Sequence, residues 1–167
     1  MDASVAIVGY MGSGKTTLGR HLARAMKLEF VDLDRAIVKS AGKGIPEIFA
    51  QHGEKHFRDL EHEALVRALD GQEPSVVACG GGTVVRPDNR TLLRGVTTVF
   101  LSEDTDVLYQ RTRGPGRPLR GTSREEFGLR YAERLPLYRE VADIEVEADR
   151  RPPEEVAEEV LACLSRR

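Results

Sequence analysis

A glycine-rich segment near the N-terminus has the residue types that bind phosphate groups. Residues 9–16 read GYMGSGKT, in which a glycine, four residues and a second glycine precede a lysine and a threonine. Glycines let backbone N–H groups turn toward phosphate oxygens, and a helix that begins there presents the positive end of its dipole. Lys15 can reach the β- and γ-phosphates of a nucleoside triphosphate, and the Thr16 hydroxyl can ligate Mg²⁺. The segment predicts a P-loop.

A glycine turn without a ligand is the alternative interpretation of this segment. An apolar run at 4–9 precedes it and a helical pattern at 15–26 follows it, which is the context that a P-loop requires. A dinucleotide-binding fingerprint is excluded, because it would need a glycine where Thr17 stands. The motif predicts a nucleoside triphosphate with Mg²⁺ and leaves the phosphoryl acceptor open.

Two carboxylates, Asp32 and Asp34, follow the second apolar run. Ligands of an open α/β sheet bind beyond the carboxyl ends of its strands, and both side chains share a face if the strand continues through them. One carboxylate could hold a Mg²⁺-bound water, and the other could orient an alcohol for phosphoryl transfer. The alternative is that the pair caps the next helix, with Asp34 as the N-cap.

A glycine triplet, Gly80–Gly82, directly follows the third apolar run. Such a sequence allows the backbone to approach a ligand closely, although a sharp turn alone would also explain it. The third run carries no Asp at its end, so the usual second metal-binding carboxylate of P-loop proteins is missing there. We therefore assign the metal to Thr16 and Asp32.

Arg58 and Glu61 are three residues apart on a helical pattern and share one face of it. A surface ion pair worth about 0.3–0.5 kcal/mol is one interpretation. The other is that Glu61 holds the Arg58 guanidinium toward a ligand carboxylate, which Arg binds through two parallel hydrogen bonds. Arg134, on a later helical pattern, is a second candidate for the same anion.

Residues 111–124 read RTRGPGRPLRGTSR, with five Arg and no acidic residue. Glycine and proline break regular structure here, so we predict a mobile, cationic lid over about 112–124. Arg117 in this lid could place its charge where the γ-phosphoryl group becomes negative, and closure would exclude water. A solvated surface loop is the alternative.

The elements that position these residues alternate along the chain. Short apolar runs are typical of strands covered on both faces, and helical patterns lie between them. We expect an α/β fold in three layers, with a five-stranded parallel sheet flanked by helices, as one domain over 1–167. The expected strands are 4–9, 29–33, 75–79, 96–101 and 143–146. The expected helices are 15–26, 35–41, 45–50, 54–69, 88–93, 104–111, 124–141 and 153–164.

Composition narrows the function further. The 167 residues carry a net charge of −2 and 5% aromatic residues, which argues against a polyanion-binding or nucleic-acid-binding protein. We expect no membrane segment, because no apolar run approaches about 18–20 residues, and no signal peptide, because the first apolar run begins at Ser4. Cys79 and Cys163 suggest reduced thiols in a cytoplasmic protein, and we expect a monomer.

The chain resembles the shikimate kinase family from Val5 to about Leu164. The resemblance rests on motifs in a fixed order: GYMGSGKTTLG (9–19), VDLD (31–34), IPEIF (45–49), FRDLE (57–61), GGGTV (80–84), RPL (117–119), RLPLYREVAD (134–143) and the stretch 151–153. It implies an ATP- and Mg²⁺-dependent kinase that phosphorylates the 3-hydroxyl of shikimate in aromatic amino acid biosynthesis. One local departure is Cys79, which places an oxidisable thiol near the expected pocket.

The resemblance also implies a role for each matching residue. For ATP, the phosphates would be bound by Gly12, Ser13, Gly14, Lys15, Thr16 and Thr17, the transferring phosphate by Arg117, and the adenine side by Arg111, Arg151 and Pro153. For shikimate, Asp34 would engage the reacting hydroxyl, Arg58 and Arg134 would bind the carboxylate with Glu61 holding Arg58, and Gly80, Gly81 and Gly82 would line the pocket. For Mg²⁺, Thr16 would be a ligand and Asp32 would act through water. Lys15, Asp34 and Arg117 would be the catalytic residues.

Two other functions remain open at this stage. A related small-molecule kinase, such as one acting on gluconate, shares the P-loop and the need to hold a carboxylate. A catalytically inactive relative that only binds ligands would be expected to lack at least one site residue, and Lys15, Asp34, Arg58, Arg117 and Arg134 are all present.

Overall fold

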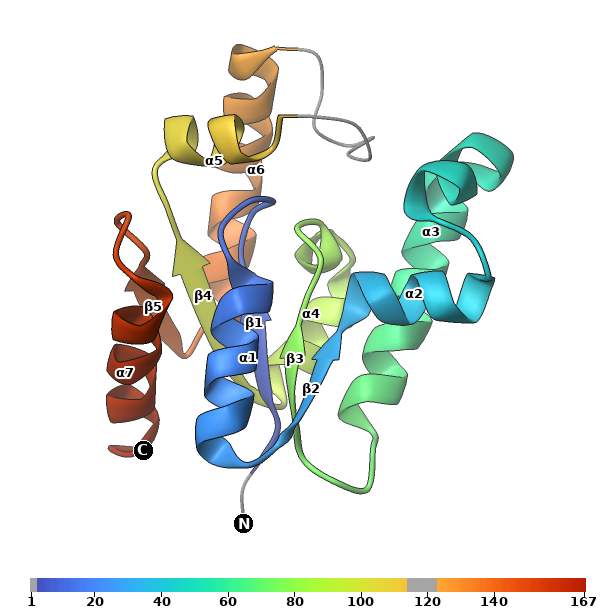
Figure 1. Cartoon of the computed structure of the whole chain (residues 1–167). Coiled ribbons are helices and arrows are strands. Elements are labelled where there is room, and N and C mark those ends of the chain that lie inside the picture. The colour runs from blue at the N-terminus through green and yellow to red at the C-terminus, as the bar shows by residue number, and fades with distance from the viewer. Residues whose placement is uncertain (1–2, 114–122) are drawn as a thin grey trace.

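A twisted sheet of parallel strands forms the centre of the computed structural model, which describes residues 3–113 and 123–167. The strand order is β2-β3-β1-β4-β5, and every neighbouring pair is parallel (Figure 1). The predicted five-stranded parallel sheet is confirmed. The strands are β1 (Val5–Val8), β2 (Glu29–Asp32), β3 (Ser75–Ala78), β4 (Thr97–Ser102) and β5 (Ile144–Glu147).

Helices cover both faces of this sheet, which confirms the predicted three layers. Helices α1 and α7 pack against each other on one face, and α3, α4 and α6 lie on the other (Figure 1). The helices are α1 (Lys15–Met26), α2 (Leu33–Ala41), α3 (Ile45–Leu69), α4 (Pro87–Arg94), α5 (Thr105–Arg111), α6 (Arg124–Val141) and α7 (Pro153–Leu164), with a 3₁₀ turn η1 (Thr83–Val85).

Strand β1 shows why the apolar runs are continuous rather than alternating. Its Ala6 and Val8 belong to the core beneath α3 and α6, whereas Val5 and Ile7 belong to the core beneath α1 and α7. All four side chains are at most 2% exposed. Since each buried Val or Ile contributes about 1.5–3 kcal/mol, a strand between two helical layers needs apolar residues on both faces.

The sheet brings the predicted site residues to one edge. The loops that follow β1, β2 and β3 all leave from the carboxyl ends of parallel strands, at the upper edge in Figure 1. There they lie between α3 on one side and α5 and α6 on the other. This is the edge at which open α/β sheets bind their ligands.

Helix α3 is interrupted at the place that the sequence predicts. We expected separate helices at 45–50 and 54–69, and the structure has one long element with a break at Gly53, whose φ is 81° and ψ is 177°. This backbone conformation is essentially restricted to glycine. Pro46 and Glu47 lie in the first turn of the helix, as expected for a helix start.

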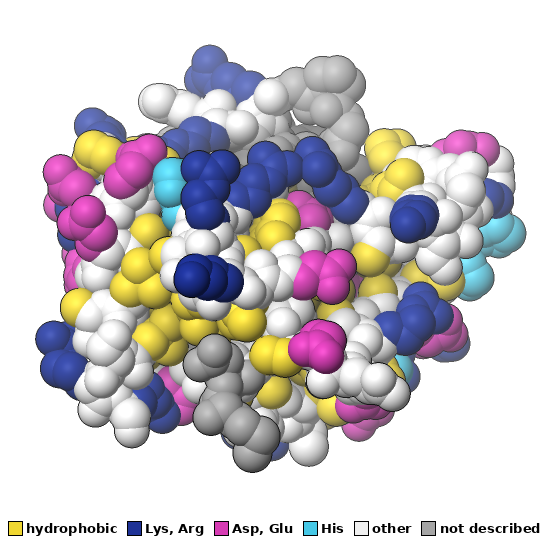
Figure 2. Space-filling model, turned by 60° about the horizontal axis from the view of Figure 1, so that its bottom comes forward, with side chains coloured by type: hydrophobic (Ala, Val, Ile, Leu, Met, Phe, Trp, Pro, Cys, Tyr) yellow, Lys and Arg dark blue, Asp and Glu magenta, His cyan; other side chains and the backbone are white. Residues whose placement is uncertain are grey.

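The surface carries charges of both signs. On the face shown in Figure 2, basic and acidic side chains are interspersed, and several Lys and Arg side chains lie close together in the upper part of the view. Within residues 3–113 and 123–167, no helix has the length and apolar character needed to span a membrane. Most of the predicted lid, including Arg117, lies outside the described residues.

Replacing Gly53 by alanine tests the break in α3. We expect Gly53→Ala to lower the free energy of unfolding by about 1–3 kcal/mol, because a Cβ makes this backbone conformation costly. Gly71→Ala is the matched control: its φ is not in the left-handed region, and its added Cβ would come no closer than 3.6 Å to its surroundings. Urea unfolding of both variants measures the difference, and equal stabilities would contradict the prediction.

Candidate active site

The loop between β1 and α1 has the backbone geometry of a phosphate cradle. Gly12 and Gly14 have φ values of 83° and 97°, and α1 begins directly after Gly14. The ammonium of Lys15 folds back over the loop and donates to the Tyr10 carbonyl at 3.0 Å. The left-handed glycines, the helix N-terminus and the lysine therefore surround one small volume that suits a phosphate group.

Asp32 contacts Thr16 and lies at the start of a helix rather than within a continuing strand. The Thr16 hydroxyl donates to Oδ2 of Asp32 at 2.8 Å, while Oδ1 accepts the backbone N–H of Arg35 at 3.2 Å. Strand β2 ends at Asp32, which is the N-cap of α2, and Asp34 lies in the first turn of that helix. The condition that the strand continues through both carboxylates is therefore not met. The alternative of helix capping is right for Asp32 and wrong for Asp34.

A cavity of about 370 Å³ nevertheless brings the two carboxylates and the P-loop together. The turn from strand to helix keeps both side chains at the same edge of the sheet, so the error in local structure does not change their neighbours. The cavity is lined by Met11, Gly12, Gly14, Lys15, Thr16, Asp32, Asp34, Ala78, Cys79, Gly80, Gly81 and Arg111.

A second cavity of about 310 Å³ adjoins the other side of the P-loop. The Arg111 guanidinium belongs to both cavities and donates to the Gly12 carbonyl at 3.3 Å. The residues predicted for the adenine side of ATP are thus gathered next to the phosphate cradle. This cavity is lined by Gly12, Ser13, Gly14, Thr17, Leu18, Leu101, Arg111, Ala148, Arg151, Pro153 and Val156.

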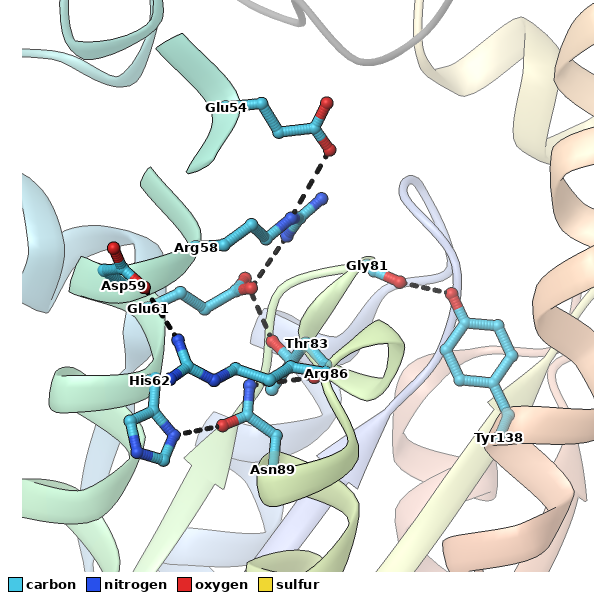
Figure 3. Close-up of polar contacts among 10 residues, drawn as sticks. All are labelled: Glu54, Arg58, Asp59, Glu61, His62, Gly81, Thr83, Arg86, Asn89 and Tyr138. Atoms are coloured by element: carbon cyan, nitrogen blue, oxygen red, sulfur yellow. Dashed lines mark hydrogen bonds and ion pairs between the residues drawn. The ribbon is translucent and has the colours of Figure 1, made fainter. Parts of the chain in front are cut away.

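Arg58 and Glu61 form a buried ion pair, not a surface one. Nη1 of Arg58 lies 2.7 Å from Oε1 of Glu61, and the two side chains are 14% and 1% exposed. The Thr83 hydroxyl donates to the other oxygen of Glu61 at 3.1 Å (Figure 3). Burial raises the pKa of Glu61, and the neighbouring Arg58 charge opposes that rise. Glu61 therefore holds the Arg58 guanidinium from the buried side.

Each residue of the glycine triplet lies close to a different part of the site. A Cβ on Gly82 would lie 2.6 Å from Cζ of Arg58, and one on Gly80 would lie 2.7 Å from Oε2 of Glu61. A Cβ on Gly81 would lie 3.1 Å from the backbone nitrogen of Met11 in the P-loop. The alternative of a simple turn is therefore insufficient, because each glycine makes room for a different part of the site.

Two guanidinium nitrogens remain without a partner beside this site. Nη2 of Arg58 and Nη1 of Arg134 are buried and have no hydrogen-bond partner among the residues that the structure describes. Arg134 is 9% exposed on α6 and lies over the Tyr10 ring, with Cζ 5.7 Å from its centroid. Buried donors of this kind are expensive to leave unpaired, so both suit an anionic ligand.

Comparison with known proteins identifies the family to which this site belongs. The family model described as Shikimate kinase matches residues 11–165. The chain belongs to the shikimate kinase family. The shikimate kinase of Nitrobacter winogradskyi is 42% identical over 168 residues, covering 98% of this chain and 78% of that protein.

Solved structures agree with this family. The shikimate kinase from Acinetobacter baumannii, solved in complex with shikimate, matches with a TM-score of 0.93 and 35% identity, covering 99% of this chain and 94% of that one. A gluconokinase from Sinorhizobium meliloti matches with a TM-score of 0.62 and 23% identity, covering 98% of this chain and 92% of that one. The second likeness shows a shared fold alone.

Several residues that support the site were not among the predicted ones. Thr83 holds Glu61, and the Asn89 amide donates to the Thr83 carbonyl at 2.9 Å, while its oxygen lies 2.6 Å from Nδ1 of His62 (Figure 3). Tyr138 donates to the Gly81 carbonyl. Thr83 and Tyr138 lie within the motifs GGGTV and RLPLYREVAD, and Tyr138 follows Arg134 by four residues on the same helical face.

Cys79 lines the first cavity, as its position before the glycine triplet predicts. The side chain is 3% exposed, and burial raises the pKa of its thiol to about 12. Since oxidation proceeds through the thiolate, the thiol of the folded protein is much less reactive at neutral pH than the sequence suggests.

The pH dependence of stability tests the burial of Glu61. A carboxyl with a raised pKa binds its proton more tightly in the folded than in the unfolded chain, so its ionisation lowers stability as pH rises above about 4.3. Glu61→Gln removes this ionisable group. We expect the free energy of unfolding of Glu61→Gln, relative to wild type, to rise between about pH 4 and pH 7, by about 1.4 kcal/mol per unit of pKa shift.

Glu54→Gln is the matched control for this measurement. Glu54 also contacts Arg58, at 3.6 Å, but its side chain is 57% exposed. Solvent screens that pair. The free energy of unfolding of Glu54→Gln, measured with urea at about pH 4 and pH 7, should therefore differ from that of wild type by no more than about 0.5 kcal/mol. If the free energy of unfolding of Glu61→Gln runs parallel to that of wild type across this pH range, the Glu61 carboxyl does not titrate as its burial requires.

Proposed function

We propose that this chain transfers the γ-phosphoryl group of ATP to the 3-hydroxyl of shikimate, giving shikimate 3-phosphate for aromatic amino acid biosynthesis. The observation that carries the proposal is one cavity that is lined by the P-loop, by Asp34 and by Gly80 and Gly81 of the glycine triplet. Arg58 packs directly behind that triplet. The P-loop for the phosphoryl donor, a carboxylate that can orient an alcohol and an arginine that can bind a carboxylate thus follow one another across the site.

Asp34 is the residue that engages the acceptor hydroxyl. Its Oδ1 lies 3.3 Å from the position of a Cβ on Gly80, so the carboxylate packs close to the glycine backbone, and both residues line the cavity. Phosphoryl transfer passes through a loose transition state and depends mainly on positioning and on charge stabilisation. Asp34 therefore orients the hydroxyl toward the γ-phosphate and accepts its proton as the new bond forms.

The P-loop and its surroundings suit ATP with a hard divalent cation. The phosphates would lie against the backbone of 12–17, and the adenine side against the cavity formed with Arg111, Arg151 and Pro153. Thr16 and Asp32 present two oxygen atoms 2.8 Å apart beside that loop, which is the donor type that Mg²⁺ prefers. When bound there, Mg²⁺ would neutralise phosphate charge.

Specificity for a carboxylic acid comes from the two arginines. Within residues 3–113 and 123–167, Nη2 of Arg58 and Nη1 of Arg134 have no hydrogen-bond partner. Arg binds a planar carboxylate through two parallel hydrogen bonds. Arg117 completes the proposal as the residue that meets the transferring phosphate from the lid. A monomeric, cytoplasmic protein without nucleic-acid or membrane partners also stays a prediction.

A turnover assay with two acids tests the proposed acceptor. Gluconate is the competing substrate, because a gluconate kinase would share the P-loop and the need to bind a carboxylate. We expect ADP release that requires both Mg²⁺ and shikimate, while gluconate gives no more than the ATPase background. Turnover with gluconate alone would make the chain a kinase of the related class, and calorimetric binding of shikimate without any product would indicate an inactive binding protein.

Replacement of Asp34 tests the orientation of the hydroxyl. Asp34→Asn should lower kcat by about 10²–10⁴-fold, the range for loss of a positioned acid–base group, while KM for ATP stays close to wild type. Asp70→Asn, at the exposed C-terminal end of α3, is the control for loss of an Asp charge. Steady-state kinetics with shikimate varied measure both, and a kcat within twofold of the control would remove Asp34 from the chemical step.

A further inference from the structure

The Tyr138 hydroxyl lies between two elements that the proposed acceptor site uses. Tyr138 is fully buried on α6, one helical turn after Arg134. Its hydroxyl donates to the carbonyl oxygen of Gly81, 57 residues away in the sequence (Figure 3). A side chain of the arginine-bearing helix is therefore bonded directly to the backbone of the glycine triplet.

Tyr138 also lies beside Arg134, because the two residues are one helical turn apart on the same face of α6. Burial raises the pKa of Tyr138 well above its usual range, and the nearby Arg134 charge opposes that rise. The phenol thus keeps its proton. Because a hydroxyl can donate one hydrogen bond and accept others, Tyr138 can accept from Arg134 while it donates to Gly81.

The Gly81 peptide is a sensitive place for such a bond. A Cβ on Gly81 would lie 3.1 Å from the Met11 nitrogen, so this peptide is packed against the P-loop. The next residue, Gly82, lies against the Arg58 guanidinium. A shift of the Gly81 carbonyl would consequently move the triplet relative to both Arg58 and Arg134.

We propose that Tyr138 is a positioning residue for the acceptor acid: its hydroxyl fixes Arg134 relative to the Gly80–Gly82 backbone, so that Arg134 and Arg58 bind one carboxylate. The inference rests on the proposed function and adds to it a residue that touches neither substrate. It assigns to Tyr138 an effect on the affinity for the acceptor, separate from the affinity for ATP.

The Phe variant isolates the hydroxyl, because the ring has its own packing. The Tyr138 ring stacks on Phe100 with centroids 5.0 Å apart, and a phenylalanine ring would keep that contact. Thr98→Val is the matched control. The Thr98 hydroxyl is also fully buried and donates to the backbone carbonyl of Leu93 at 2.8 Å. Thr98 lies near the start of β4, the end of that strand away from the candidate site.

Steady-state kinetics of Tyr138→Phe and Thr98→Val, with each substrate varied in turn, separate positioning from stability. We expect Tyr138→Phe to raise KM for shikimate about tenfold, the ratio for about 1.4 kcal/mol of binding free energy, with KM for ATP within about twofold. Thr98→Val should leave both KM values within about twofold of wild type. It should lower Tm by about as much as Tyr138→Phe does. An unchanged KM for shikimate, or equal increases for both substrates, would overturn the inference.

A double-mutant cycle tests whether the hydroxyl acts through Arg134. Arg134→Lys, Tyr138→Phe and the double variant are compared by KM for shikimate. If Tyr138 works by placing the guanidinium, the factor by which the double variant raises KM for shikimate should be smaller than the product of the factors of the two single variants. An increase in KM equal to that product would show that the two residues act independently and would overturn the proposed role.

A measurement on the wild-type protein keeps the inference testable if Tyr138→Phe does not fold. The chain has four tyrosines, so labelling their Cζ atoms with ¹³C gives few resonances. The Tyr138 resonance should shift when shikimate is added alone, and its failure to shift would count against the proposal. Absence of shikimate turnover in wild type would instead overturn the proposed function, a result distinct from normal turnover with an unchanged KM in Tyr138→Phe.

Discussion

The buried ion pair between Arg58 and Glu61 is the interaction on which the proposed acceptor side of the site depends. Burying a carboxylate that is 1% exposed carries a desolvation penalty, which shows in the raised pKa of Glu61. The structure compensates it on two sides, with the Arg58 guanidinium and the Thr83 hydroxyl. The remaining Nη2 of Arg58 is buried and has no partner in the described part of the chain, so it suits an anionic ligand.

That ion pair also explains the glycines next to it. The guanidinium and the Glu61 carboxylate occupy the space where Cβ atoms of Gly82 and Gly80 would lie, while Gly81 packs on the P-loop. A loop without side chains thus connects the phosphate cradle to the buried charges. Backbone atoms therefore pack between the proposed donor and acceptor sides, an arrangement that suits a reaction that relies on positioning.

Much of the fold and part of the site follow from the sequence because their signals are local. The P-loop spacing, the apolar runs and the helix starts at Pro46 and Pro153 depend on residues close together in the chain, and the structure confirms them. The transition after β2 was harder to predict. Asp32 ends the strand by capping α2, and the sequence pattern of alternating carboxylates did not distinguish this from a longer strand.

The sequence by itself determined the residue types that the chemistry needs: a phosphate loop, two carboxylates at a strand end, and arginines on later helices. Only the tertiary structure decided which charges are buried. Arg58 and Glu61 could equally have formed a solvated pair on a helix surface. Glu61 is buried because α3 packs against η1. The bond from Tyr138 to Gly81 likewise joins residues 57 positions apart. Such contacts depend on how helices pack on the sheet, and no periodicity or motif in a single chain encodes that distance.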